Sequence, residues 1–192
     1  LKNDIGVSDL AKSPEVLTLE EQQENEEEIW NLLEQAVRGA CIKFVETREQ
    51  EGENLKRDLL LKLDEMLSLV AVVEERSPEI VQEYRQKLEQ KVRELLSDSQ
   101  MDEGRIATEV TIFADKICVD EETVRLKSHI EAMKTALIAG GSIGRKLDFI
   151  AQEMNREANT TLSKANDLKL SDCAIDLKTG IEKVREQIQN LE

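Results

Sequence analysis

The chain has 192 residues, of which 40% are hydrophobic, 35% are charged and only 3% are aromatic, with two prolines. This composition is typical of long amphipathic helices and does not fit a β-sandwich or a β-barrel. The sequence contains no run of about 18 uncharged apolar residues and no basic leader followed by an apolar stretch, so it predicts neither a membrane span nor a secretory signal. We therefore expect an all-α, or nearly all-α, cytoplasmic protein with no membrane partner.

The formal net charge of −15 is unevenly distributed along the chain. Residues 1–104 contain 13 basic and 26 acidic side chains, whereas residues 105–192 contain 13 and 15. Much of the acidity is the run LEEQQENEEE (Leu19–Glu28), which we interpret as the solvated first turns of a helix, where the helix dipole favours acidic side chains. A polyanionic partner is therefore more compatible with the second half of the chain than with the first.

Three cysteines, Cys41, Cys118 and Cys173, are widely spaced and form no C-x-x-C motif. An odd number with this spacing predicts buried free thiols and not a disulfide framework or a structural zinc site. The first residue is Leu1 and not Met, which we interpret as a sign that the chain is part of a longer protein.

Three consecutive helices are predicted in the acidic first half. The first follows a capping position at Thr18 and ends near Gly52, and the second ends at Ser77-Pro78, where Pro78 fits the first turn of the third. Short connections between such helices favour antiparallel hairpins, although the periodicity allows long rods equally well.

A domain boundary is predicted at SDSQMDEG (Ser97–Gly104), the one stretch of linker composition in the middle of the chain. It separates an acidic long-helix region, residues 1–104, from a helical bundle domain, residues 105–192. A short helix is expected over Arg105–Lys116, with a strand at VTIF (Val110–Phe113) as the minor alternative because its composition is β-branched enough for a strand.

Three more helices are predicted after this point. The first is capped by Asp120 and ends at Gly140-Gly141, and the second occupies GRKLDFIAQEMNREANTTLSKAND (Gly144–Asp167). The last is opened by Ser171 or Asp172, and its apolar residues alternate steps of three and four up to Leu191, which predicts a seam for a partner helix in the same or a neighbouring subunit.

The segment Gly144–Asp167 has an apolar stripe, but its other faces are densely charged. Neither a nucleotide-binding glycine motif nor an H-E-x-x-H motif is present in the chain, and His129 is the single histidine, so a pair of catalytic imidazoles is excluded within this sequence. Glu153 and Glu157, at i, i+4, can instead contribute carboxylates to a divalent metal, although solvated or paired surface charges explain the same spacing.

A phosphate-binding interpretation rests on the cations of the second half. The basic residues concentrated there are Arg125, Lys127, Arg145, Lys146, Arg156 and Lys164. Because the chain has few aromatic residues for base stacking, any RNA contact is expected to be mostly through the backbone and through shape.

Four motifs in the second half, EVTIFADK (Glu109–Lys116), DEETVRLKSHI (Asp120–Ile130), GRKLDFIAQEMNRE (Gly144–Glu157) and SKAND (Ser163–Asp167), closely resemble the C-terminal domain of the YicC family. TREQEGENLKRDL (Thr47–Leu59) and RSPEIVQEYRQKL (Arg76–Leu88) resemble the preceding helices of that family. The resemblance implies a divalent-metal-dependent (Mn²⁺ or Mg²⁺) endoribonuclease of the bacterial cytoplasm, assembled as a homo-hexamer around RNA and acting on small regulatory RNA. No DNA partner is expected. Family members begin with a mixed α/β portion that we expect to be missing from this chain.

From these observations we assign roles to the matched polar residues as hypotheses. Those assigned to catalysis are Glu122, His129 and Glu153. Those assigned to metal binding are Asp148, Glu153 and Glu157, and those assigned to RNA binding are Arg125, Arg145, Lys146, Arg156 and Lys164. The alternative is a non-catalytic helical assembly or adaptor protein that binds RNA or protein partners, in which the same residues form ion pairs between subunits.

Overall fold

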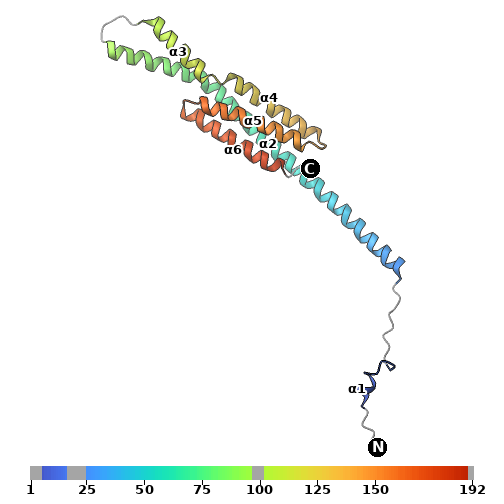
Figure 1. Ribbon diagram of the computed structural model, residues 1–192. Coiled ribbons are helices and arrows are strands. Elements are labelled where there is room, and N and C mark those ends of the chain that lie inside the picture. Colours follow the sequence, from blue (N-terminus) through green and yellow to red (C-terminus); the bar gives the residue numbers. More distant parts are fainter. Residues whose placement is uncertain (1–5, 17–24, 97–101, 190–192) are drawn as a thin grey trace, which may run out of the picture. The chain divides into compact units, whose positions relative to one another are not determined.

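The computed structural model describes residues 6–16, 25–96 and 102–189, and all regular structure in these ranges is helical (Figure 1). The helices are α1 (Val7–Leu10), α2 (Glu26–Leu96), α3 (Glu103–Ile117), α4 (Asp120–Ala139), α5 (Gly144–Lys164) and α6 (Leu168–Ile188). The prediction of an all-α fold is confirmed, and Val110–Phe113 lies within α3 and not in a strand. Thr18, Leu191 and most of the predicted linker lie outside the described residues.

The three helices predicted in the first half are one continuous helix, α2, so the predicted breaks at Gly52 and Ser77-Pro78 are wrong. A single glycine costs a helix only about 1 kcal/mol relative to alanine, which good helix formers on both sides can offset. Proline costs about 3 kcal/mol inside a helix. Val73 and Ile80, on either side of Pro78, are both buried in the same hydrophobic cluster, and this packing holds the helix together across the proline.

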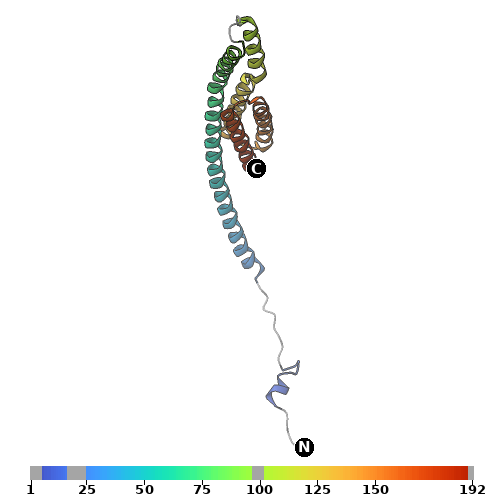
Figure 2. The same cartoon turned by 90° about the vertical axis from the view of Figure 1, so that its left-hand side faces the viewer.

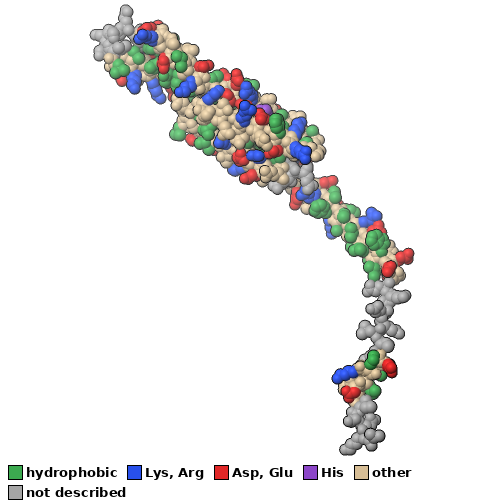
Figure 3. Space-filling model, in the orientation of Figure 1, with side chains coloured by type: hydrophobic (Ala, Val, Ile, Leu, Met, Phe, Trp, Pro, Cys, Tyr) green, Lys and Arg blue, Asp and Glu red, His purple; other side chains and the backbone are tan. Residues whose placement is uncertain are grey.

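The chain forms two compact units, Leu1–Arg48 and Glu49–Glu192, and α2 belongs to both. In the first unit, residues 26–48 of α2 expose a row of apolar side chains. Figure 3 shows these side chains gathered along that part of the helix. They include Ile29, Trp30, Leu33, Val37 and Phe44, each about half exposed or more.

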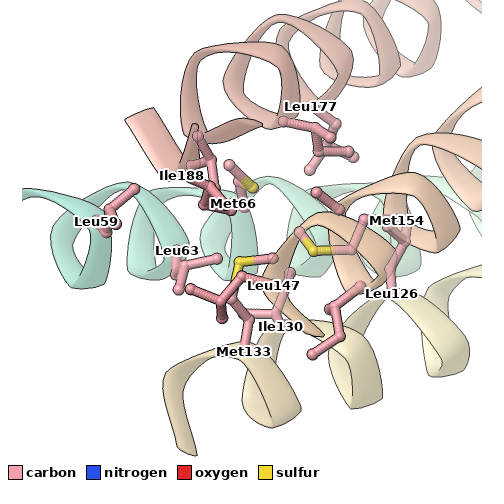
Figure 4. Packing of buried hydrophobic residues seen from close by; sticks show 14 of the residues in the cluster. Leu59, Leu63, Met66, Leu126, Ile130, Met133, Leu147, Met154, Leu177 and Ile188 are labelled. Carbon is pink, nitrogen blue, oxygen red and sulfur yellow. The ribbon is translucent and has the colours of Figure 1, made fainter. Parts of the chain in front are cut away.

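In the second unit, α2 lies alongside α4, α5 and α6 and supplies one wall of a helical bundle (Figures 1 and 2). Its core is a single hydrophobic cluster in which apolar side chains of all four helices point toward one another (Figure 4). Leu63 from α2, Ile130 and Met133 from α4, Leu147 from α5 and Leu177 from α6 are completely buried. The buried residues of each helix recur every three or four positions, as the apolar stripe of an amphipathic helix does.

A second hydrophobic cluster lies at the other end of the bundle, where α3 meets α2 and the start of α6. It contains Ile117 at the end of α3 and Val119 from the α3–α4 connection, together with Leu170 from α6. Beside it, the rings of Tyr84 and Phe113 stack with centroids 3.7 Å apart, which joins α2 to α3. This cluster packs the end of α3, at Ile117, against α2 and α6, while most other side chains of α3 stay exposed.

The start of α6 differs from the prediction of Ser171 or Asp172. The helix begins at Leu168, and Asp167 is its N-cap, accepting a hydrogen bond from the Leu170 backbone N–H at 3.1 Å. At α4 the predicted cap was one residue too late, because Asp120 is the first helical residue and Val119 is the N-cap. The predicted end at Gly140-Gly141 is confirmed, and their φ angles of 68° and 86° are in the region where glycine is strongly preferred.

The Asp167 carboxylate also binds Arg76 of α2, so that one residue caps α6 and ties it to another helix. Arg76 Nη2 donates to Asp167 Oδ2 at 2.9 Å, and Nη1 donates to Glu83 Oε1 at 2.6 Å. Hydrogen bonding to Arg76 lowers the pKa values of both Asp167 and Glu83. The same carboxylates, Asp167 first, raise the pKa of Arg76.

The cysteines correct one further expectation. All three are free, as predicted, but Cys41 and Cys118 are exposed and Cys173 is half-buried. Burial raises the pKa of the Cys173 thiol. The prediction of buried thiols failed for Cys41 because the face of α2 that contains it has no covering helix among the described residues of its own unit.

Candidate functional site

Two of the acidic residues of α5, Asp148 and Glu157, lie on opposite sides of the helix. Asp148 and Glu157 are nine residues apart, which at 3.6 residues per turn puts them about 180° apart around the helix axis. Asp148 faces α6, where its Oδ1 accepts a hydrogen bond from Arg185 Nε at 3.2 Å. Glu157 faces α4, where its Oε1 is 3.6 Å from Arg125 Nη1. Asp148 and Glu157 thus serve contacts with two different helices.

The contact between α4 and α5 contains two ion pairs, in one of which the cation is on α4 and in the other on α5. We call these two pairs, together with His129 and Glu153 further along the same contact, the α4–α5 seam. Besides the pair of Arg125 with Glu157, Lys164 Nζ donates to Glu122 Oε1 at 2.9 Å and to the backbone oxygen of Cys118 at 2.8 Å. The two carboxylates have only 8% and 7% of their side-chain surface exposed, whereas Arg125 is 54% exposed. Solvent therefore reaches the seam on the arginine side.

The Glu122 carboxylate is incompletely satisfied. Its Oε2 atom is buried and has no hydrogen-bond partner in the described part of the chain. Burying a carboxylate oxygen without a partner is costly, and such an atom in a native structure calls for a physical reason. Lys164 and the N-terminal turn of α4, in which Glu122 lies, offset part of that cost. The orphaned oxygen makes the seam the strongest candidate for a site of proton or ligand exchange in this fold.

His129 and Glu153 continue the same seam. The pairing of Arg125 with Glu157 sets the register of the antiparallel helices α4 and α5. One turn further in both helices the register reaches His129 on α4 and Glu153 on α5, each half-buried. The structure records no hydrogen bond or ion pair between these two described residues, so they are neighbours in register only. All three residues predicted to be catalytic, Glu122, His129 and Glu153, thus lie along one line.

The predicted RNA-binding residues separate into two groups. Arg125 and Lys164 belong to the seam, where their charges already have partners. Arg145, Lys146 and Arg156 are exposed on α5 and have no ion pair among the described residues. The exposed group keeps its full charge available for a ligand.

The predicted metal ligands Asp148, Glu153 and Glu157 are not gathered at one point. In residues 6–16, 25–96 and 102–189, no group of three or more His, Cys, Asp or Glu side chains is arranged to hold a metal ion. The reason is the helical periodicity that turns Asp148 toward α6 and Arg185. The described residues of this chain therefore do not fit the metal implied by the resemblance, and no chemical step is derived through it.

Sequence reasoning missed two residues of this region. Arg185, which binds Asp148, is on a different helix and left no signal in local spacing. Phe149 is 63% exposed on the outer face of α5. A signal for it existed, because Phe149 falls outside the apolar stripe of Leu147, Ala151 and Met154.

The described residues form an all-helical bundle with a polar seam and, on α5, three exposed cations that have no ion pair among them. Comparison with known proteins makes the class specific. Residues 73–192 match the family model described as endoribonuclease YicC-like, C-terminal, and residues 1–57 match the model described as endoribonuclease YicC-like, N-terminal region. The chain belongs to the YicC-like endoribonuclease family. Because the N-terminal region is represented in residues 1–57, the prediction that it is missing is wrong.

Two curated relatives extend over almost the whole chain. The protein named probable endoribonuclease YicC of Clostridioides difficile (strain 630) is 44% identical over 191 residues, which cover 99% of this chain. A protein of the same name from Haemophilus influenzae (strain ATCC 51907 / DSM 11121 / KW20 / Rd) is 34% identical over 191 residues, which cover the full chain. The chain spans 65% of the length of each relative.

Among the described helices, none is both long and apolar enough to cross a membrane. The predicted domain boundary between residues 1–104 and 105–192 stays a prediction.

Proposed function

We propose that this chain is the helical part of an endoribonuclease that cleaves phosphodiester bonds of RNA. The observation that carries the proposal is the α4–α5 seam, with its orphaned Glu122 oxygen and the only histidine of the sequence, in a chain that belongs to the YicC-like family. The names of the two relatives, probable endoribonuclease, support the same activity.

In the proposed mechanism, His129 and Glu153 are the proton carriers. Breaking a phosphodiester requires that a base take a proton from the attacking oxygen and that an acid give one to the leaving oxygen. An imidazole can both accept and donate a proton, and a carboxylate that is its neighbour in the register can carry out the opposite transfer. Glu157, which is already ion-paired, holds Arg125 one helical turn from this pair, and Glu122 holds Lys164 further along the seam.

The exposed cations hold the RNA in this proposal. Arg125 is more than half exposed despite its ion pair, and Arg145, Lys146 and Arg156 are exposed on α5. Their guanidinium and ammonium groups would bind phosphate oxygens and release counterions from the RNA. Charge reversal at Arg145 and Arg156 together is therefore expected to weaken RNA binding and to reduce the slope of log K against log salt by about 2.

The remaining properties implied by the family resemblance are part of the proposal. They are dependence on Mn²⁺ or Mg²⁺, a homo-hexameric ring around the RNA, small regulatory RNA as substrate and a location in the bacterial cytoplasm. Because the described carboxylates of one chain do not converge, a metal would need ligands from beyond them, such as a second subunit or the RNA phosphates.

The test is cleavage of an end-labelled structured RNA by the full-length protein with Mn²⁺, Mg²⁺ or EDTA. His129→Ala and Glu153→Gln are each expected to reduce the cleavage rate by about 100-fold or more, as expected for loss of a proton carrier. The matched control is Asp148→Asn, which alters an acidic residue of α5 that faces α6 and not the seam. Equal activity of all three variants would contradict the role of the seam, and loss of cleavage in EDTA would support metal dependence.

A second candidate function is a non-catalytic helical assembly protein. It is favoured by the exposed apolar row of α2 in residues 26–48, which includes Trp30 and Phe44 and has no covering helix among the described residues of its unit. An adaptor would bind RNA or protein without turnover, whereas the enzyme cuts many RNA molecules per protein. A substoichiometric amount of protein that converts all the RNA would exclude the purely structural alternative.

A further inference from the structure

Phe149 is the one aromatic side chain of the described part of residues 49–192 without an aromatic partner. The sequence has three aromatic residues in that range, and two of them, Tyr84 and Phe113, stack on each other. Phe149 instead has 63% of its surface exposed on α5, although the helix has buried positions for apolar residues at Leu147 and Ile150 on either side. An exposed phenyl ring next to inward-facing positions presents its faces to solvent.

Three exposed side chains around Phe149 are cationic, and the exposed Gln152 between them is neutral. Arg145 is one turn before it and Arg156 two turns after it on the same side of α5, and Lys146 borders it at three residues' distance. All three cations are exposed, and none has an ion pair among the described residues. Asp148, the residue before Phe149, is half-buried and turned toward α6, where it pairs with an arginine. The surface that combines the aromatic ring with positive charge, which we call the α5 outer face, consists of Arg145, Lys146, Phe149 and Arg156.

We infer that the α5 outer face binds an unpaired segment of RNA, with one base stacked on Phe149 and the flanking phosphates on Arg145 and Arg156. This inference rests on the proposed function and specifies its substrate. Aromatic rings surrounded by cations bind single-stranded nucleic acid because every base has a face that can stack, while the charges follow the backbone. In a duplex the base faces are covered by their neighbours, so a loop, a bulge or a single-stranded end fits this surface and a continuous helix does not.

The α5 outer face adjoins the proposed proton carriers. Glu153 is four residues after Phe149, one turn along α5, and it belongs to the α4–α5 seam. A base held on Phe149 would therefore place the neighbouring phosphodiester within reach of the seam. In this inference Phe149 selects unpaired RNA and positions it. It takes no part in proton transfer.

The experiment measures binding by the full-length protein of two labelled RNAs, an unstructured oligonucleotide and a fully paired hairpin of equal length. Phe149→Ala is expected to weaken binding of the unstructured RNA by about 5- to 100-fold, the effect of losing one base–aromatic stack, and to leave the hairpin unchanged. Phe149→Leu keeps the apolar surface but has no ring, so it should be as weak as alanine, whereas Phe149→Tyr should restore binding. A 2-aminopurine base in the unstructured RNA should lose fluorescence on binding to the native protein and keep more of it with Phe149→Ala.

Two controls distinguish loss of a base stack from loss of apolar surface or of the folded structure. Ile138→Ala, which alters an exposed apolar residue of α4 (65% exposed), is expected to change neither RNA affinity. Thermal melting and sedimentation of each variant check fold and assembly. If Phe149→Leu binds as the native protein does, if both RNAs weaken equally, or if Phe149→Ala changes the oligomeric state, the face is not a stacking surface and the inference is overturned.

Failure of this inference can be distinguished from failure of the proposed function. Cleavage that depends on His129, together with unchanged selectivity in Phe149→Ala, would leave the endoribonuclease in place and remove only the stacking role. Absence of both RNA binding and cleavage in the native full-length protein would overturn both.

Discussion

The two units of the chain use the same kind of amphipathic helix in opposite ways. In residues 49–96, α2 buries Leu59, Leu63 and Met66 against three other helices, whereas in residues 26–48 it exposes Leu33, Val37 and other large apolar residues. The helix itself is continuous across both parts. The difference shows that helical periodicity identifies an apolar face but does not reveal whether the covering element lies in the same unit.

A matched pair of leucine substitutions on α2 tests this comparison with the largest expected change in the free energy of unfolding. Leu63→Ala removes a completely buried side chain and is expected to lower the free energy of unfolding by about 2–5 kcal/mol through lost burial and a cavity. Leu33→Ala, at a residue with 52% exposure, is expected to change it by less than about 0.5 kcal/mol. Urea unfolding of the 192-residue chain measures both, and equal losses would break the comparison.

A second pair uses glycine. A Cβ atom at Gly180 of α6 would be 3.2 Å from Met66 Cε, so Gly180→Leu would force α6 away from α2, with an expected loss of about 1–3 kcal/mol. At Gly39 nothing lies within 4 Å of the added Cβ, and Gly39→Leu should be neutral or stabilising by up to about 1 kcal/mol through helix propensity. The measurement is again the free energy of unfolding, and a destabilised Gly39→Leu chain would reveal a contact on that face of α2.

A smaller change in stability is expected when the pH is varied, and it arises in the second unit, Glu49–Glu192. Hydrogen bonding to Arg76 lowers the pKa of Asp167, so the folded state binds that proton less readily than the unfolded state does. The stabilisation is therefore fully present above the unfolded pKa of about 3.9 and is lost as the pH falls through the folded pKa. Asp167→Asn retains an N-cap for α6 but removes the charge, so it should be less stable than the native chain near neutral pH and approach it in acid.

Unfolding curves of the native and Asp167→Asn chains between pH 7 and pH 2 measure this convergence. Asp58→Asn is the matched control, because Asp58 pairs with Lys62 on an exposed part of α2. A constant difference between the native and Asp167→Asn chains at all pH values would mean that the ion pair with Arg76 does not stabilise the fold.

The smallest effect is spectroscopic and concerns the first unit alone. Trp30 is the only tryptophan of the sequence and is 62% exposed, so acrylamide should quench its fluorescence in the dilute 192-residue chain almost as efficiently as it quenches free tryptophan. Protection of Trp30 in the full-length protein, but not in this chain, would show that the apolar row is covered there. Protection in the dilute chain would break the comparison between the two units.

The candidate site was only partly predictable for a related reason. Glu122, His129 and Glu153 were selected from helical spacing and family resemblance, and the structure places them along one seam. Asp148 was grouped with Glu153 and Glu157 because all three are acidic residues of one helix. Spacing within α5 does turn Asp148 away from Glu157, but only the neighbouring helices determine that it meets Arg185 on α6.

By itself the sequence determined the helical class, the inward faces of α4, α5 and α6 and the glycine stop after α4, because periodicity and backbone preference are local properties. Tertiary structure decided that α2 continues through Pro78, that Asp167 both caps α6 and binds Arg76, and that Glu122 keeps one buried oxygen unpaired among the described residues. Each of these depends on a side chain of another helix. The free energy of such contacts is set by packing and desolvation in three dimensions, which local spacing does not contain.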